Sequence, residues 1–188
     1  HLSSMPDQML YMQMNLINSH DTPRLYAHQE IFDFSIYAGI VKLLYVLPGM
    51  PNIYYGEEIK LEGPNRSVES SRYPMQWDQR KWDQKFYQLY TSLGAFRKKY
   101  SQTLKDGAWA VAYSDAYSLV FARYDQEIAI VCVVSRADNP HTICFDNARL
   151  QLTEIIESEA LRATVSKGDV EIVVLERASA LIVARRYT

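Results

Sequence analysis

The sequence predicts two fold classes in succession, an α/β segment over residues 1–101 and an all-β domain over residues 102–188. The first prediction depends on a strand, a long helix and a second strand, which follow one another between Asn15 and Gly56. The second depends on short apolar runs that recur about every eight to twelve residues after Tyr100, with turn residues between them. This spacing is typical of an antiparallel β-sandwich.

The α/β segment begins with a short buried strand, expected at about residues 15–17. A helix is predicted over about residues 28–47, because its apolar residues recur at helical spacing and Pro48-Gly49 ends the run. Gly39, inside this helix, marks either a tolerated weakness or a place of close packing. A second strand is predicted at 51–56. A strand, a helix and a strand in this order favour parallel pairing of the two strands.

A second helix is predicted over residues 79–99, with Asp78 as its N-cap and basic residues in its last turn. Trp77 and Trp82 are expected to pack against this helix, and Trp109 is expected to lie in a core. No helix pattern of useful length continues beyond Tyr100. The strands predicted for the sandwich are 108–113, 117–124, 127–135, 141–145, 152–157, 170–175 and 180–186.

Composition excludes several classes of function. The 188 residues carry a net charge of −2, and acidic and basic residues are interspersed, so the basic stripe of a nucleic-acid-binding protein is missing. No apolar run reaches the roughly 18 residues that a membrane helix needs. Cys132 and Cys144 both lie in apolar runs, where buried free thiols are favoured over a disulfide. The histidines are scattered and no carboxylates have calcium-loop spacing, so no metal or other cofactor is implied.

One polar segment, Asn18-Ser-His-Asp-Thr-Pro-Arg24, directly follows the first predicted strand, where an α/β barrel carries its polar chemistry. It resembles the fourth conserved motif of the α-amylase family of glycoside hydrolases, in the form seen in neopullulanases, cyclomaltodextrinases and maltogenic amylases. Residues 48–59 resemble the segment at the family's eighth barrel strand, and residues 75–78 resemble a box before its last barrel helix. The resemblance implies the last two βα units of a (β/α)8 TIM barrel, followed by an antiparallel β-sandwich C-terminal domain.

The resemblance also implies roles for individual residues. Retaining glycoside hydrolysis needs one carboxyl group as nucleophile and another as acid/base. Asp21 would be a third carboxylate, which accepts hydrogen bonds from sugar hydroxyls and stabilises the transition state. His20 would position the same sugar. Asn18, Arg24 and Arg72 are candidates for substrate binding, the two arginines through their planar, multi-donor side chains. Without these neighbours, a His-Asp pair would more simply be a loop residue and a turn cap.

The same resemblance places the nucleophile and the acid/base upstream of His1, so the 188-residue chain alone is expected to be inactive. Glu57 and Glu58 are not expected to replace them, because adjacent residues of a strand point in opposite directions. A structural role is favoured for both, with pairing to Arg24 or Arg72. The neopullulanase branch usually carries Asp-Pro and Cys-Arg in the following loop, and this chain departs from that pattern, which leaves the close subfamily open.

The intact enzyme is expected to act on α-glucans, maltooligosaccharides or cyclodextrins, without nucleic acid or membrane as partner and in the cytoplasm. The linkage, α-1,4 or α-1,6, stays open, as does the choice between hydrolysis and transglycosylation. A homo-oligomer, or association with the missing barrel segment, is expected, because part of a barrel has open strand edges and an uncovered apolar face.

Two alternatives differ in class. One is a non-catalytic carbohydrate-binding module on the sandwich, which would need a row of exposed aromatic side chains. The candidates for that row are Trp109, Tyr113, Tyr117 and Tyr124. The other is an amylase-like subunit without activity. Such a subunit has no need of sugar-binding groups, so the presence of His20-Asp21 argues against it.

Overall fold

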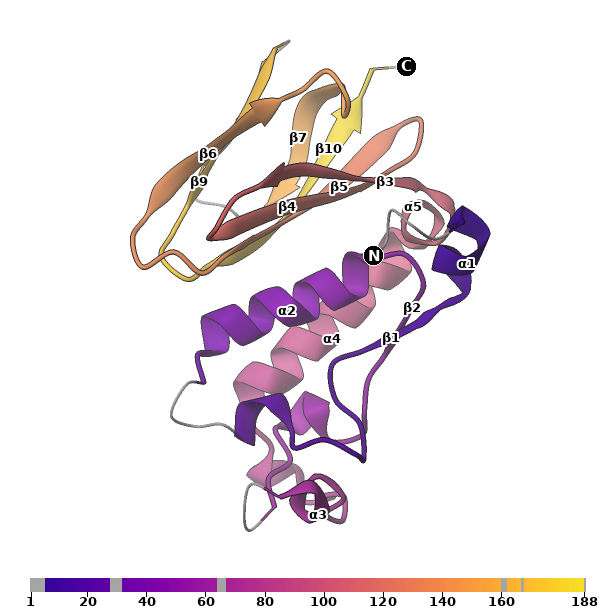
Figure 1. Ribbon diagram of the computed structural model, residues 1–188, viewed down its shortest axis with the longest axis vertical. Coiled ribbons are helices and arrows are strands. Elements are labelled where there is room, and N and C mark those ends of the chain that lie inside the picture. The colour runs from indigo at the N-terminus through magenta and orange to yellow at the C-terminus, as the bar shows by residue number, and fades with distance from the viewer. Residues whose placement is uncertain (1–5, 28–31, 64–66, 160–161, 167, 188) are drawn as a thin grey trace.

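The computed structural model describes residues 6–27, 32–63, 67–159, 162–166 and 168–187. Helices, a five-stranded sheet and a three-stranded sheet form successive layers (Figure 1). The helical layer contains α2 (Phe34–Val46) and α4 (Gln84–Lys99), which lie below the sandwich in this view. One buried apolar cluster lies between the two sheets, and another lies between the five-stranded sheet and the helices.

The region after residue 107 is an antiparallel β-sandwich, which confirms the all-β prediction. The larger sheet has the order β3-β4-β5-β10-β7 and the smaller one the order β6-β9-β8. The strands are β3 (Ala108–Ser114), β4 (Ser118–Tyr124), β5 (Ile128–Ser135), β6 (His141–Asp146), β7 (Leu152–Ser158), β8 (Arg162–Val165), β9 (Asp169–Val174) and β10 (Ser179–Arg186). Among these strands the prediction missed only β8. Polar and apolar residues alternate in β8, but its four residues are too few for this pattern to indicate a strand.

The strands of the larger sheet read as unbroken apolar runs because both faces of that sheet are covered. In β5, Ala129 and Val131 face the smaller sheet, whereas Ile130 and Cys132 face the helices. This division follows from the two-residue repeat of a strand.

The prediction of two buried thiols is right for Cys132 and wrong for Cys144, because Cys144 lies on the solvent side of β6. Both cysteines are free.

Helix α2 packs directly on the larger sheet. It begins at Phe34 because the Asp33 carboxylate accepts hydrogen bonds from the backbone amides of Ser35 and Ile36, at 2.7 and 3.2 Å. Residues 28–31, where the sequence predicted the start of this helix, lie outside the described residues. A Cβ atom at Gly39 would approach Val134 Cγ1 to 2.8 Å, so this glycine is a place of close packing.

The second long helix starts later than predicted. Asp83, not Asp78, caps α4 by accepting from the amides of Lys85 and Phe86. Asp78 instead caps the short 3-10 helix η4 (Gln79–Lys81), because its carboxylate accepts from the amide of Arg80. A short helix also follows α4, in a stretch where the sequence shows no helix pattern of useful length.

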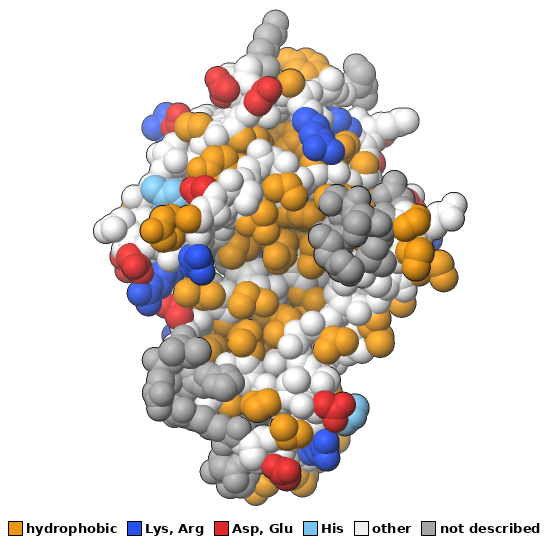
Figure 2. Space-filling model, viewed as in Figure 1, with side chains coloured by type: hydrophobic (Ala, Val, Ile, Leu, Met, Phe, Trp, Pro, Cys, Tyr) orange, Lys and Arg blue, Asp and Glu red, His pale blue; other side chains and the backbone are white. Residues whose placement is uncertain are grey.

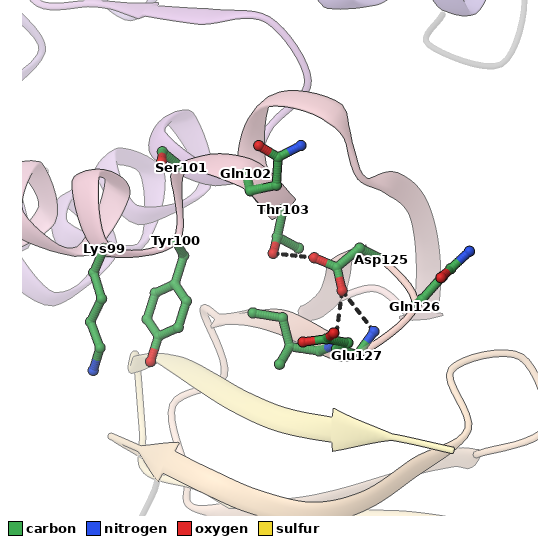
Figure 3. Close-up of a pocket in the computed structure, with 9 residues that line it drawn as sticks. Lys99, Tyr100, Ser101, Gln102, Thr103, Asp125, Gln126 and Glu127 are labelled. Carbon is green, nitrogen blue, oxygen red and sulfur yellow. Dashed lines mark hydrogen bonds between the residues drawn. The ribbon is translucent and has the colours of Figure 1, made fainter. Parts of the chain in front are cut away.

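The additional helix, α5 (Ser101–Asp106), connects α4 to the sandwich. Thr103 on this helix donates to the Asp125 carboxylate, 2.5 Å away, and Asp125 also accepts from the amides of Glu127 and Ile128 (Figure 3). These bonds attach α5 to the turn between β4 and β5. Thr103 and Asp125, which both line the shallow pocket at this junction, therefore bond to each other.

The first two strands, β1 (Met14–Leu16) and β2 (Met50–Asn52), pair in parallel, with Met14 opposite Met50, as predicted. The short helix α1 (Asp7–Met12) precedes them. The prediction that the first strand is buried is wrong, because Met14 and Leu16 are 57% and 49% exposed. Within the described residues these two strands form a sheet of their own, so no further described strand pairs with their outer edges. The complete barrel therefore stays a prediction.

The three tryptophans lie in different surroundings. Trp77 is 79% exposed, so the prediction that it packs on the last helix is wrong. Trp82 is partly buried and donates to the Gln76 carbonyl. Trp109 stacks on Phe121 at a centroid distance of 5.9 Å, in agreement with the predicted core position.

Figure 2 shows hydrophobic side chains gathered over the middle of the molecule, where the helical layer meets the sandwich. In the described ranges every helix is too short or too polar to cross a bilayer.

Candidate functional site

The candidate site is formed by three loops at the carboxyl end of the parallel pair β1–β2, away from the sandwich (Figure 1). The first loop leaves β1 and contains η2 (Leu25–Ala27). The second leaves β2 and contains η3 (Glu57–Ile59), and the third contains α3 (Val68–Ser71). Because the strands are parallel, the two strand ends deliver their loops to the same edge of the sheet.

Three predicted site residues meet at the surface of these loops. Asp21 Oδ1 lies 3.3 Å from His20 Nε2 and 3.3 Å from an Arg72 guanidinium nitrogen. Arg72 Nε also donates to the His20 carbonyl oxygen at 2.8 Å, so one guanidinium holds the backbone and the carboxylate of the loop. The side chains of His20, Asp21 and Arg72 are 66%, 69% and 53% exposed. Their polar atoms are therefore accessible to a ligand.

Beneath this exposed group lies a buried ion pair between Arg24 and Glu57. The guanidinium Nη1 and the carboxylate Oε1 are 2.7 Å apart, and both side chains are at most 3% exposed. The other oxygen of Glu57 accepts from Asn18 Nδ2 at 2.7 Å and from the Tyr37 hydroxyl at 2.9 Å. The structural role predicted for Glu57, in a pair with Arg24, is confirmed.

Arg24 also fixes the loop that carries Arg72. Its Nη2 donates to the carbonyl oxygens of Tyr55 and Ser71, at 2.7 and 3.1 Å. Its guanidinium carbon lies 4.7 Å from the centroid of the Tyr54 ring. Since Ser71 immediately precedes Arg72, the buried arginine helps to set where the exposed arginine lies.

Two of the residues predicted to bind substrate are therefore placed differently from His20, Asp21 and Arg72. Asn18 and Arg24 are only 5% and 2% exposed, and their side chains are bonded within the protein. A direct sugar contact does not fit this burial. The Asn18 side chain instead spans two loops, because its oxygen accepts from the Leu25 amide at 3.0 Å.

Two tyrosines that sequence reasoning missed complete the buried network. The hydroxyls of Tyr37 on α2 and Tyr90 on α4 are 2.7 Å apart. Burial raises the pKa of both tyrosines, and the nearby Glu57 carboxylate raises them further, so both hydroxyls stay protonated. Burial also raises the pKa of Glu57 above its usual value, because the hydrogen bonds from Arg24, Tyr37 and Asn18 offset it only in part. A tyrosine on an otherwise apolar helix face was the signal in the sequence.

The chemistry available at this surface is binding rather than bond cleavage by a carboxyl pair. A polyol placed here would meet one carboxylate, one imidazole and one guanidinium. Glu57, the second carboxylate of the network, is buried and fully engaged. Among the residues with described placement, no cluster of three His, Cys, Asp or Glu side chains is arranged to hold a metal ion.

Comparisons with known proteins point to one group of enzymes. The chain is 32% identical over 145 residues to a cyclomaltodextrinase of Geobacillus thermopakistaniensis, a match that covers 73% of this chain and 23% of that protein. It is 33% identical over 107 residues to the intracellular maltogenic amylase of Bacillus subtilis, which covers 57% of this chain and 18% of the relative. The chain thus spans about a quarter or less of the length of these relatives.

A solved structure described as a cyclomaltodextrinase has the same fold. It matches 97% of this chain and 31% of its own chain, with a TM-score of 0.79 and 22% sequence identity. No protein-family model matches the sequence. The described α/β segment and sandwich thus occur together, in this arrangement, within a larger protein.

Proposed function

Because this chain belongs to the α-amylase family of glycoside hydrolases, we propose that it forms one wall of an active site that cleaves α-glucosidic bonds. Its relatives are named for action on cyclomaltodextrins and for maltose production. The proposed substrates are α-glucans, maltooligosaccharides or cyclodextrins. The exposed His20 and Asp21 after β1, together with Arg72 after α3, carry this proposal, because they offer sugar hydroxyls a carboxylate and two donors at one place.

In the proposed retaining mechanism Asp21 stabilises the transition state. Its carboxylate would accept hydrogen bonds from the hydroxyls of the sugar at the cleaved bond and favour the distorted, oxocarbenium-like ring. Hydrogen bonds of this kind supply several kcal/mol when they strengthen in the transition state. His20 would donate to the same sugar, and Arg72 would hold both residues in place through the two contacts described above.

Asn18 and Arg24 would then act from behind the sugar-binding surface. Their bonds to Glu57 join the loop after β1 to the loop after β2, and the Arg24 bond to Ser71 extends this support to Arg72. A catalytic group works best when such supporting contacts fix its position.

The nucleophile and the acid/base would come from the rest of the intact enzyme, on other strands of a TIM barrel. Exposed Met14, Leu16 and Met50 on β1 and β2 support this view, since they would be covered by neighbouring strands. The chain alone would then be inactive, and would self-associate or bind the missing segment. A cytoplasmic location is supported by the description of the Bacillus subtilis relative as intracellular.

A chimera tests the proposal. The matching segment of the Geobacillus cyclomaltodextrinase would be replaced by this chain, and cyclodextrin hydrolysis would be measured. Asp21→Asn should lower kcat by about 10² to 10³, which corresponds to several kcal/mol of lost transition-state stabilisation. KM should change much less. Asp106→Asn, at an exposed carboxylate on α5, is the matched control and should leave kcat unchanged.

Full activity of the Asp21→Asn chimera would exclude the proposed role of this carboxylate. Hydrolysis of maltotriose by the isolated 188-residue chain would exclude the proposal that the bond-breaking groups lie outside it.

A further inference from the structure

A separate cavity lies on the sandwich, where the turn between β3 and β4 meets the connection between β5 and β6. Its volume is about 440 Å³, within the range of small-molecule sites. The residues that line it are Asp115, Tyr117, Ala137, Asp138, Asn139 and His141. None of them belongs to the site at the end of β1 and β2.

The two chain segments that form this cavity are fixed to each other. Asp115 Oδ1 accepts from the backbone amides of Tyr117 and Ser118, at 2.8 and 2.6 Å, which shapes the β3–β4 turn. Arg136, after β5, donates two guanidinium bonds to the Ala116 carbonyl, at 3.1 and 2.9 Å. Its backbone amide also donates to the Tyr117 carbonyl at 2.9 Å. A ligand would therefore find this cavity already formed, which lowers the entropic cost of binding.

The opposite wall is equally fixed. One ring nitrogen of His141 is hydrogen-bonded to the Ser118 hydroxyl at 3.0 Å, and the other to the Asn139 carbonyl at 3.2 Å. Arg177 holds one oxygen of the Asp138 carboxylate through its Nε at 2.8 Å. Both nitrogens of His141 are thus hydrogen-bonded, and the residue forms a fixed wall of the cavity.

Three lining groups have no such engagement. Within the described part of the chain, the Tyr117 ring contacts no other ring or cation, its hydroxyl makes no hydrogen bond, and the residue is 61% exposed. The side-chain amide of Asn139 likewise finds no partner there. The second oxygen of Asp138, Oδ2, also has no described bond. An aromatic face, an amide and a carboxylate oxygen therefore border one preformed cavity.

The other aromatic candidates on the sandwich differ from Tyr117. Trp109 stacks on Phe121, and the Tyr113 hydroxyl donates to Asp115 at 2.8 Å. The guanidinium of Arg186 lies over the Tyr124 ring, 4.5 Å from its centroid. The row of exposed aromatics that a module built on a flat sheet face would need is therefore not present among these four residues, and Tyr117 is the one combined with a cavity.

We propose that this cavity binds one pyranose ring of an α-glucan at a non-catalytic site. The apolar face of the sugar packs on the Tyr117 ring, and vicinal hydroxyls bond to the Asn139 amide and the free oxygen of Asp138. The choice of an α-glucan rests on the proposed function, whereas the preference for a neutral sugar ring rests on the cavity alone.

The 188-residue chain, labelled with ¹⁵N, tests this proposal by titration with maltotriose, followed by amide chemical shifts. Saturable shifts are expected at residues 115–118 and 136–141. Tyr117→Ala should weaken the apparent affinity by about tenfold, equivalent to about 1.4 kcal/mol. Tyr187→Ala is the matched control, because Tyr187 is similarly exposed, at 54%, and lies outside the cavity. Sorbitol, which has hydroxyls but no ring, should bind at least tenfold more weakly than maltotriose.

Three results would overturn the proposal. Maltotriose could shift none of these amides, the shifts could remain unchanged in Tyr117→Ala, or sorbitol at equal concentration could produce the same shifts. Asn139→Ala provides a second variant on an exposed side chain and should also weaken binding. Asp21→Asn separates the two proposals, because it should leave the shifts at 115–118 intact. Retained sugar binding here, together with full activity of the Asp21→Asn chimera, would contradict the proposed function and leave the sandwich site standing.

Discussion

The buried pair of Arg24 and Glu57 gives the sharpest test of how the candidate site is supported. Glu57→Gln keeps the shape of the side chain, but it removes the negative charge and replaces one of the two accepting oxygens with a donating amide nitrogen. Arg24 would then be a cation that is 2% exposed and without its carboxylate. Arg24→Met produces the reverse situation, a buried carboxylate without its guanidinium.

The expected effect follows from the geometry. Two unit charges about 4 Å apart attract by about 4 kcal/mol at an effective dielectric constant of about 20. Removal of one partner of a buried pair typically costs about 3–5 kcal/mol. Each single variant should therefore lose about 3–5 kcal/mol of unfolding free energy, a large part of the roughly 5–15 kcal/mol of an ordinary domain. The double variant leaves no lone charge, so it should lose less than the sum by about 2–3 kcal/mol.

Urea unfolding followed by tryptophan fluorescence measures these differences, because Trp109 lies against the same core that covers the pair. The surface pair of Glu154 and Arg185 supplies the matched control. Its charged atoms are 3.6 Å apart and both side chains are about two-thirds exposed. Glu154→Gln should therefore cost less than about 1 kcal/mol.

Additive losses in the double variant would refute the reasoning, because additivity means that the two charges do not interact. A loss for Glu57→Gln no larger than that for Glu154→Gln would refute it as well, since burial would then make no difference.

Two further predictions concern packing and pH. Gly39→Ala should lower the unfolding free energy by about 1–3 kcal/mol, because the new methyl group would meet Val134 at 2.8 Å. Gly94→Ala is the control and should raise the unfolding free energy by up to about 1 kcal/mol, because a methyl group there would have nothing within 4 Å. Equal effects of the two variants in urea unfolding would contradict the close packing of α2. Partial burial raises the pKa of Asp125, but the hydrogen bond from Thr103 and two backbone amides outweigh it, so the pKa lies below its usual value. The stability that this carboxylate contributes is present above its unfolded-state pKa of about 3.9 and is lost as the pH falls through the lower folded-state value. Asp125→Asn should therefore destabilise the chain at pH 7 and much less near pH 2, and a constant difference across this range would exclude the prediction.

The sequence was informative wherever one local pattern decides the structure. The unbroken apolar run over residues 128–134 predicts strand β5, because a short apolar run between turn residues suits a strand that is covered on both faces. Helix boundaries were less accurate because several residues compete for each cap. Asp78 and Asp83 are both suitable N-caps, and only the three-dimensional course of the chain, with Asp78 on η4, decides between them.

For the candidate site, sequence similarity located His20 and Asp21 but did not reveal the depth at which their neighbours lie. Arg24 and Arg72 have the same side chain, yet one is 2% exposed and the other about half exposed. The difference arises because Glu57, the Tyr54 ring and the carbonyl oxygens of Tyr55 and Ser71 surround the first, and those residues are far from it in sequence. Exposure of Met14 and Leu16 was equally beyond a local pattern, since it depends on which strands lie beside β1.

The packing of α2 against the five-stranded sheet has a consequence for modularity. The change in sequence character at residue 101 suggests two exchangeable modules, but one cluster joins Tyr37 and Val41 of the helix to Ile130 and Leu181 of the sheet. A sandwich taken from a distant relative would bring its own side chains to that contact and would leave α2 mismatched. Natural recombination at this point in the chain would therefore succeed only when helix α2 and the sandwich come from the same parent protein. The sandwich and the loops of the candidate site are then inherited together.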